Sequence, residues 1–96
     1  MDIAVRAKAR MRLRRRKISQ RLLVWEKGFA ALGYDPEEFR RDKYGALIKR
    51  SDYGKQRSPY GWEVDRIRPE SRGGLNALSN LRPLHWNSQK QRLISL

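Results

Sequence analysis

Basic side chains carry most of the chemistry that this sequence offers. Its 96 residues include 23 Lys and Arg, of which 16 are Arg, against 10 Asp and Glu, so the formal charge is +13. A guanidinium can hold a phosphate through two parallel hydrogen bonds, whereas the ammonium of lysine acts as a point charge. A dense positive field binds polyanions and releases their counterions. The composition therefore predicts a nucleic-acid partner, ahead of a membrane surface or an acidic protein.

Cysteine and histidine are scarce, which limits the other chemistry available. The chain has no cysteine, and His85 is its only histidine. Disulfides, thiol catalysis and thiolate zinc sites are therefore excluded. No run approaches the roughly 18 apolar residues that a membrane span needs. Basic residues interrupt the segment from Arg6 to Lys17, so it has no apolar signal-peptide core. We expect a cytoplasmic protein, prokaryotic or phage-encoded, with no membrane partner.

A helix near the N-terminus is expected to carry much of the positive charge. Apolar residues recur at steps of three, four and seven, which places them on one helix face: Ala4, Ala7, Met11, Ile18, Leu22, Trp25, Phe29 and Leu32. The pattern predicts one long helix, or two with a break near Ile18-Ser19, ending around Gly28 or Gly33. This helix either follows a phosphate backbone or packs on the protein with a solvated basic face. The side chains that would contact phosphates are Arg10, Arg14, Arg15, Arg16, Lys17 and Arg21.

The middle of the chain contains a well-marked helix start. Asp35 can cap the helix, Pro36 suits its first position, and Glu38 follows the cap by three residues. We therefore expect a short helix from Pro36 to about Lys43, which Gly45 ends. The apolar segment 46–48 that follows fits a helix or a strand.

The C-terminal third changes to a strand pattern. A polar loop is expected over residues 51–61, because it contains three turn-forming Gly and Pro residues. Residues 62–67 alternate apolar and polar, as in a strand with one solvated face. Residues 78–84 form a second extended segment, in which Pro83 requires an edge or terminal position. Residues 86–96 are typical of a terminal helix.

The segments Tyr60–Gly74 and Leu78–Trp86 resemble the HNH endonuclease family, metal-dependent nucleases of the ββα-metal type. Residues 33–36 and 51–54 resemble a small subgroup of that family without zinc cysteines. The resemblance covers about residues 25–92. It implies an α+β fold with an HNH-like ββα-metal hairpin-plus-helix core, preceded by the long basic N-terminal helix. Residues 1–24 would form the basic arm and residues 25–96 the HNH-like domain.

The resemblance also implies a site for phosphodiester hydrolysis. In the family, an Asp ligates a divalent cation, usually Mg²⁺, which prefers oxygen ligands and stabilises the developing charge. Asp65 stands at this metal-ligand position, and Asn80 stands at the position of an Asn that fixes the loop. The further metal ligand in the helix corresponds to Gln89, or to Asn87 in a slipped register.

Arg66 stands where the family has its general-base histidine. A guanidinium stays protonated and cannot accept a proton. The loss of a positioned general base typically costs about 10²- to 10⁴-fold in rate. Arg66 could also pair with Asp65 and take the place of the metal. His85 is a candidate substitute base, with a structural role as the alternative, and Tyr60 is another candidate.

Three functional hypotheses follow. The first is a nucleic-acid-binding pseudoenzyme with a degenerate nuclease centre, which grips DNA or structured RNA by charge and shape, with DNA favoured. The second is an active Mg²⁺-dependent endonuclease or nickase, so the question of enzymatic activity stays open. The third is a small basic structural or inhibitory protein acting on a nucleic-acid-binding machine.

The cations near the motif that would bind nucleic acid are Arg68, Arg72, Arg82, Lys90 and Arg92. The three tryptophans are expected in the core.

Overall fold

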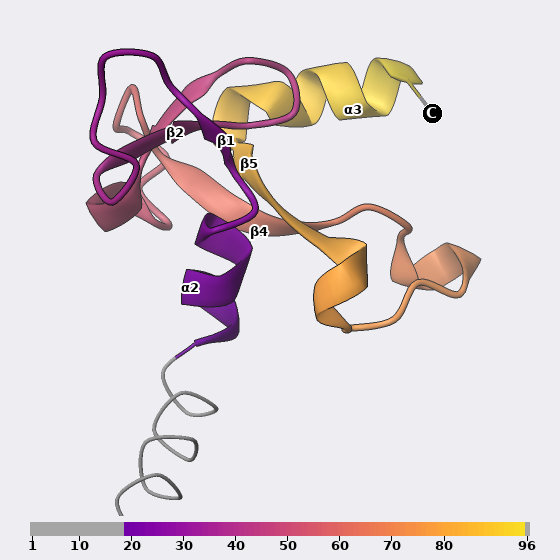
Figure 1. The fold of residues 1–96 in the computed structure, drawn as a ribbon. Helices are drawn as coiled ribbons and strands as arrows, with labels where there is room; N and C mark the ends of the chain where they lie inside the picture. The colour runs from indigo at the N-terminus through magenta and orange to yellow at the C-terminus, as the bar shows by residue number, and fades with distance from the viewer. Residues whose placement is uncertain (1–18, 96) are drawn as a thin grey trace, which may run out of the picture.

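The computed structural model of the protein describes residues 19–95 (Figure 1). Its elements are α2 (Gln20–Trp25), β1 (Phe29–Ala30), β2 (Phe39–Arg41), β3 (Leu47–Lys49), β4 (Trp62–Arg66), β5 (Leu81–His85) and α3 (Gln89–Ser95). Single 3-10 turns lie at Arg50–Asp52, Glu70–Arg72, Leu78–Asn80 and Trp86–Ser88. No helix in this part of the chain is long and apolar enough to span a bilayer.

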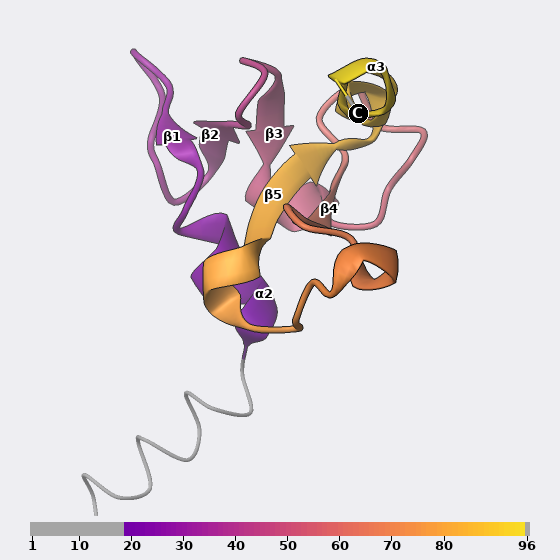
Figure 2. The same ribbon diagram turned by 90° about the vertical axis from the view of Figure 1, so that its right-hand side faces the viewer.

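The strands form two antiparallel sheets. Strands β1, β2 and β3 make one sheet in chain order, with Phe39 opposite Lys49. Strands β4 and β5 make the other, with Asp65 directly opposite Arg82. Helix α2 lies at one end of the β4–β5 pair and α3 at the other (Figures 1 and 2). The β4–β5 pair therefore lies between the two helices.

The core lies where α2, β3, β4 and β5 meet. Its buried members are Val24, Trp25, Ile48, Trp62 and Leu81, each at most 1% exposed. The rings of Trp25 and Trp62 lie 5.3 Å apart between centroids. Burial of each large apolar side chain contributes about 1.5–3 kcal/mol, so this small cluster supplies much of the stability. Both tryptophans were expected in the core, but Trp86 is 37% exposed.

The fold expected from the family resemblance is wrong, although the α+β class holds. A hairpin-plus-helix core preceded by a long helix does not describe residues 19–95, because a sheet of three short strands precedes the β4–β5 hairpin. Helix α2 has six residues and ends at Trp25, three residues before Gly28, the earlier of the two predicted ends. The predicted helical stripe continued through Phe29 and Leu32, but these side chains are 61% and 99% exposed. The expected helix over residues 1–18 lies outside the described part of the chain.

The helix predicted from Pro36 is also wrong, although its cap is present. The Asp35 carboxylate accepts a hydrogen bond from Glu37 N at 2.9 Å, and the Asp35 carbonyl accepts one from Phe39 N at 2.9 Å. Only one helical turn forms, because Phe39 then starts β2. Pairing with β3 supplies the backbone hydrogen bonds that further helix would have supplied.

The C-terminal elements follow the sequence pattern more closely. The strand predicted over 62–67 is β4, which ends at Arg66. The second extended segment begins later than predicted, because residues 78–80 form a 3-10 turn before β5. Pro83 is tolerated in β5, because both strands of a two-stranded sheet are edges. The terminal helix starts with a 3-10 turn, and α3 begins at Gln89.

Candidate functional site

Asp65 lies at the centre of a buried ion-pair cluster, called here the Asp65 cluster. Its Oδ2 accepts a hydrogen bond from Arg82 Nε at 2.9 Å, and its Oδ1 lies 3.5 Å from Arg92 Nε. The strand register sets Arg82 opposite Asp65, and α3 brings Arg92 to the other oxygen. The exposed fractions of the three side chains are 5% for Asp65, 11% for Arg82 and 19% for Arg92. The carboxylate is therefore neutralised within the fold.

The residues at Asp65 do not fit a divalent cation. Each carboxylate oxygen already faces a guanidinium, and the two guanidinium charges would repel a cation that approached. Mg²⁺ also needs several further oxygen ligands. Within residues 19–95, no group of three or more His, Cys, Asp or Glu side chains could hold a metal. Two amides were expected to complete the site. Gln89 is the first residue of α3, and Asn87 lies in the 3-10 turn before it.

Arg66 points away from Asp65, because successive side chains of a strand face opposite sides. Its Nη1 lies 3.0 Å from Glu70 Oε2, in an ion pair whose carboxylate side chain is 84% exposed. Arg66 does not pair with Asp65 as the sequence suggested; Arg82 and Arg92 take that role. Its guanidinium cannot act as a general base.

Asn80 fixes the connection between β4 and β5. Its Oδ1 accepts a hydrogen bond from Arg68 N at 2.8 Å, and its Nδ2 donates to the carbonyls of Arg68 at 3.0 Å and Leu75 at 2.8 Å. The connection packs so closely that a Cβ at Gly74 would lie 1.7 Å from the Arg68 carbonyl oxygen. Asn80 thus holds this connection with three hydrogen bonds, and Gly74 is needed for backbone packing.

His85 is held on both ring nitrogens. Its Nδ1 accepts a hydrogen bond from Asn87 N at 2.9 Å, so the proton lies on Nε2, which donates to the Pro59 carbonyl at 2.7 Å. The ring caps the 3-10 turn that follows it and ties down the preceding loop, and the residue is 6% exposed. This geometry is structural. Tyr60, the other candidate base, packs edge-on against Phe39 with ring centroids 5.5 Å apart.

Asp42 is a buried polar residue that the sequence pattern did not reveal. Its Oδ1 accepts hydrogen bonds from Tyr44 N and Ala46 N, both at 2.9 Å, and its Oδ2 accepts one from His85 N at 3.0 Å. The residue is 2% exposed. It therefore joins the β2–β3 turn to the end of β5. The Asp-Lys-Tyr-Gly sequence was a usable signal, since Asp at the start of a turn commonly accepts from the backbone two residues on.

The cations predicted to bind nucleic acid fall into separate groups. Arg82 and Arg92 are engaged by Asp65. Arg68, Arg72 and Lys90 are exposed, and their side chains form no ion pair with any residue from 19 to 95. Arg21 lies over the ring of Tyr53, 4.7 Å from its centroid. The remaining predicted cations lie outside the described residues: Arg10, Arg14, Arg15, Arg16 and Lys17.

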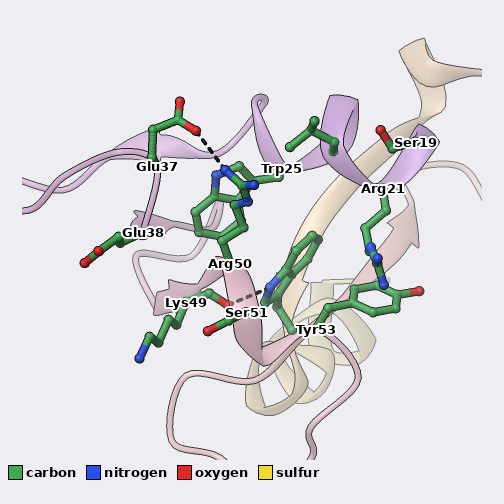
Figure 3. A pocket seen from close by; sticks show the side chains of 11 residues that line it. Ser19, Arg21, Trp25, Glu37, Glu38, Lys49, Arg50, Ser51 and Tyr53 are labelled. Carbon is green, nitrogen blue, oxygen red and sulfur yellow. Dashed lines mark hydrogen bonds and ion pairs between the residues drawn. The ribbon is translucent and has the colours of Figure 1, made fainter. Parts of the chain in front are cut away.

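A groove of about 610 Å³ opens between α2, the turn after Asp35, the end of β3 and the 3-10 turn that follows it (Figure 3). We call it the Tyr53 groove. Its lining includes the aromatic residues Trp25, Tyr53 and Trp62, the cations Arg21, Lys49 and Arg50, and the carboxylates Glu37 and Glu38. Its cations come from three separate elements, so the sequence pattern could not reveal it.

Comparisons with protein families, with curated proteins and with solved structures find no match to this chain. The relation to HNH nucleases therefore rests only on the residues quoted above, and it remains a proposal.

Proposed function

We propose that the protein binds nucleic acid, with DNA favoured over RNA, and does not hydrolyse it. The formal charge of +13 supports the binding part of this proposal, and the Asp65 cluster supports the absence of hydrolysis. The one carboxylate that the motif resemblance assigns to a metal is 6% exposed and paired with two arginines. A binding module needs no such metal, whereas hydrolysis by a nuclease of this type does.

The missing proton acceptor supports the same conclusion. Arg66 cannot take a proton from water. His85 has its Nδ1 occupied by a backbone N–H and its Nε2 proton on a carbonyl, so it offers no free lone pair to water. The segment that resembles HNH nucleases thus keeps the Asn80-fixed loop without a metal site or a base. Such a module acts where nucleic acid is accessible, which favours the cytoplasm of a prokaryotic or phage-infected cell.

Binding would use exposed cations on a rigid support. Arg68 and Arg72 lie on the connection whose backbone Asn80 holds with three hydrogen bonds, so binding does not have to order that backbone. Lys90 on α3 is also exposed. Contacts of this kind position a protein on the phosphate backbone without reading base sequence. With a formal charge of +13, the protein should bind many sequences with similar affinity.

The test combines a binding titration with a cleavage assay. A labelled duplex DNA and a structured RNA are titrated with the protein at low and high salt. A protein that neutralises six to ten phosphates loses about 10³- to 10⁵-fold in affinity between 50 and 200 mM salt. We expect at least a tenfold loss here, and no nicking of supercoiled plasmid with Mg²⁺ or Mn²⁺. Affinity that is flat across salt would overturn the binding proposal, and metal-dependent nicking would overturn the absence of hydrolysis.

A further inference from the structure

We infer that the Tyr53 groove binds an unpaired nucleotide of a single-stranded segment, with the base stacked against the Tyr53 ring. This inference rests on the proposed function, because it names the form of nucleic acid that one surface would take. It adds a recognition site that is separate from the Asp65 cluster.

The Tyr53 ring is a fixed aromatic surface. It is 38% exposed and stands edge-on against the buried Trp62, with centroids 5.1 Å apart and planes at 75°. The next residue anchors the backbone, since Gly54 N donates to the Trp62 carbonyl at 2.8 Å. Trp62 in turn packs on Trp25. Because the core sets the orientation of the ring, a base that stacks on it meets a preformed surface.

Arg21 makes this surface suited to a planar ligand. Its guanidinium lies 4.7 Å from the Tyr53 centroid, and Figure 3 shows the side chain reaching from α2 to the ring. Arginine stacks on nucleobases as well as on tyrosine. Because the guanidinium already covers one face of the ring, an entering base takes its place on that face and stacks on Tyr53, and the displaced guanidinium is free to pair with the adjoining phosphate.

The charges of the groove favour an anionic strand over a cationic segment. Arg50 adds a second cation from the turn after β3. Lys49 also lines the groove, but its Nζ lies over the ring of Phe39, 5.7 Å from the centroid, and points away from Tyr53 in Figure 3. Glu37 is already paired, with its Oε2 2.8 Å from Arg50 Nη1, and the two side chains are 69% and 46% exposed. An ion pair with this much exposure contributes little stability, so a phosphate can compete with Glu37 for Arg50. In Figure 3 the carboxylate of Glu38 points away from Tyr53.

The size of the groove favours a single strand over a duplex. A volume of about 610 Å³ lies within the ~300–1,000 Å³ typical of small-ligand sites, so it suits one or two nucleotides. Bases inside a duplex cannot reach such a site without flipping.

The experiment measures binding of a fluorescent twelve-nucleotide oligo-dT and of a blunt duplex of equal length by anisotropy. Tyr53→Leu removes the ring, Tyr53→Phe keeps it, and Phe29→Leu removes a ring that is 61% exposed and does not line the groove. We expect Tyr53→Leu to weaken single-strand binding about tenfold or more. The other two variants should bind oligo-dT within about twofold of the parent, and none should alter duplex binding. Equal losses on oligo-dT and duplex, or no loss at all, would overturn the inference.

A second pair of variants keeps the inference testable if Tyr53→Leu does not fold. Arg21→Gln and Arg57→Gln remove the same charge, but only Arg21 stacks on Tyr53, and Arg57 is exposed outside the groove. Arg21→Gln should weaken oligo-dT binding several-fold more than Arg57→Gln. Equal effects would contradict the groove and leave salt-dependent binding intact, whereas a parent protein that binds neither nucleic acid would contradict the proposed function itself. An oligo-glutamate peptide that binds in a Tyr53-dependent manner, when oligo-dT does not, would assign the groove to an acidic protein segment.

Discussion

The Asp65 cluster and the Tyr53 groove use the same pair of chemical groups, a guanidinium and a carboxylate, in opposite ways. In the cluster, Asp65 and its two arginines are at most 19% exposed, and all three charges are turned inward. In the groove, Arg50 and Glu37 are 46% and 69% exposed. Burial thus decides whether an arginine stabilises the fold or remains available to a ligand.

This difference has an energetic basis. Removing one partner from a buried ion pair leaves an uncompensated charge and typically costs about 3–5 kcal/mol. An exposed pair contributes about 0–1 kcal/mol, because water and salt screen it. The same substitution type should therefore change stability at one region and ligand binding at the other, and the predictions below separate the two.

The largest effect is expected from Asp65→Ala. The variant leaves Arg82 and Arg92 facing each other without a counterion, so the free energy of unfolding should fall by about 3–5 kcal/mol. Urea denaturation followed by tryptophan fluorescence measures this change. Glu70→Ala is the matched control, because its carboxylate pairs with Arg66 but is 84% exposed, and its cost should be at most about 1 kcal/mol. Similar costs for the two variants would remove the distinction between buried and exposed pairs.

A smaller effect, on binding alone, is expected from Arg72→Gln. Arg72 is exposed on the Asn80-fixed connection, so its loss should weaken binding to all duplex sequences alike and reduce the salt slope by about 1. Stability should change by less than about 0.5 kcal/mol. Arg82→Gln is the comparison, since it should lower stability through Asp65 instead. If Arg72→Gln leaves the salt slope unchanged, the connection between β4 and β5 is not a phosphate-binding surface.

The sequence predicted the elements that depend on local patterns. Alternation over residues 62–67 is a period-two signal that belongs to one strand, and it predicted β4 to within one residue. The cap at Asp35 was also a correct local signal, but it did not predict β2. Phe39 lies in a strand because it pairs with Lys49, ten residues further along the chain. A local helical pattern contains no information about such a contact.

The sites depended on contacts that are more distant still. Asp65 pairs with Arg82, which lies 17 residues further along the chain. The register of β4 against β5 could not be predicted from the sequence, because the connection between the two strands is irregular. Arg92 arrives from a third element. The resemblance to HNH nucleases directed attention to Asp65 and Asn80, but it could not show that arginines occupy the space around the carboxylate.

The smallest effect, and the sharpest test of the Asp65 cluster, is expected from Arg66→His. This variant gives β4 an Asp-His pair like that of the HNH motif and supplies a group that can accept a proton. It does not free the Asp65 oxygens, because Arg82 and Arg92 hold them from β5 and α3. Plasmid nicking with Mg²⁺ or Mn²⁺ should therefore stay at the level of Arg66→Gln, which removes the same charge without adding a base. Metal-dependent nicking by Arg66→His alone would mean that a cation displaces both arginines, and that replacement of the general base was the only barrier to catalysis.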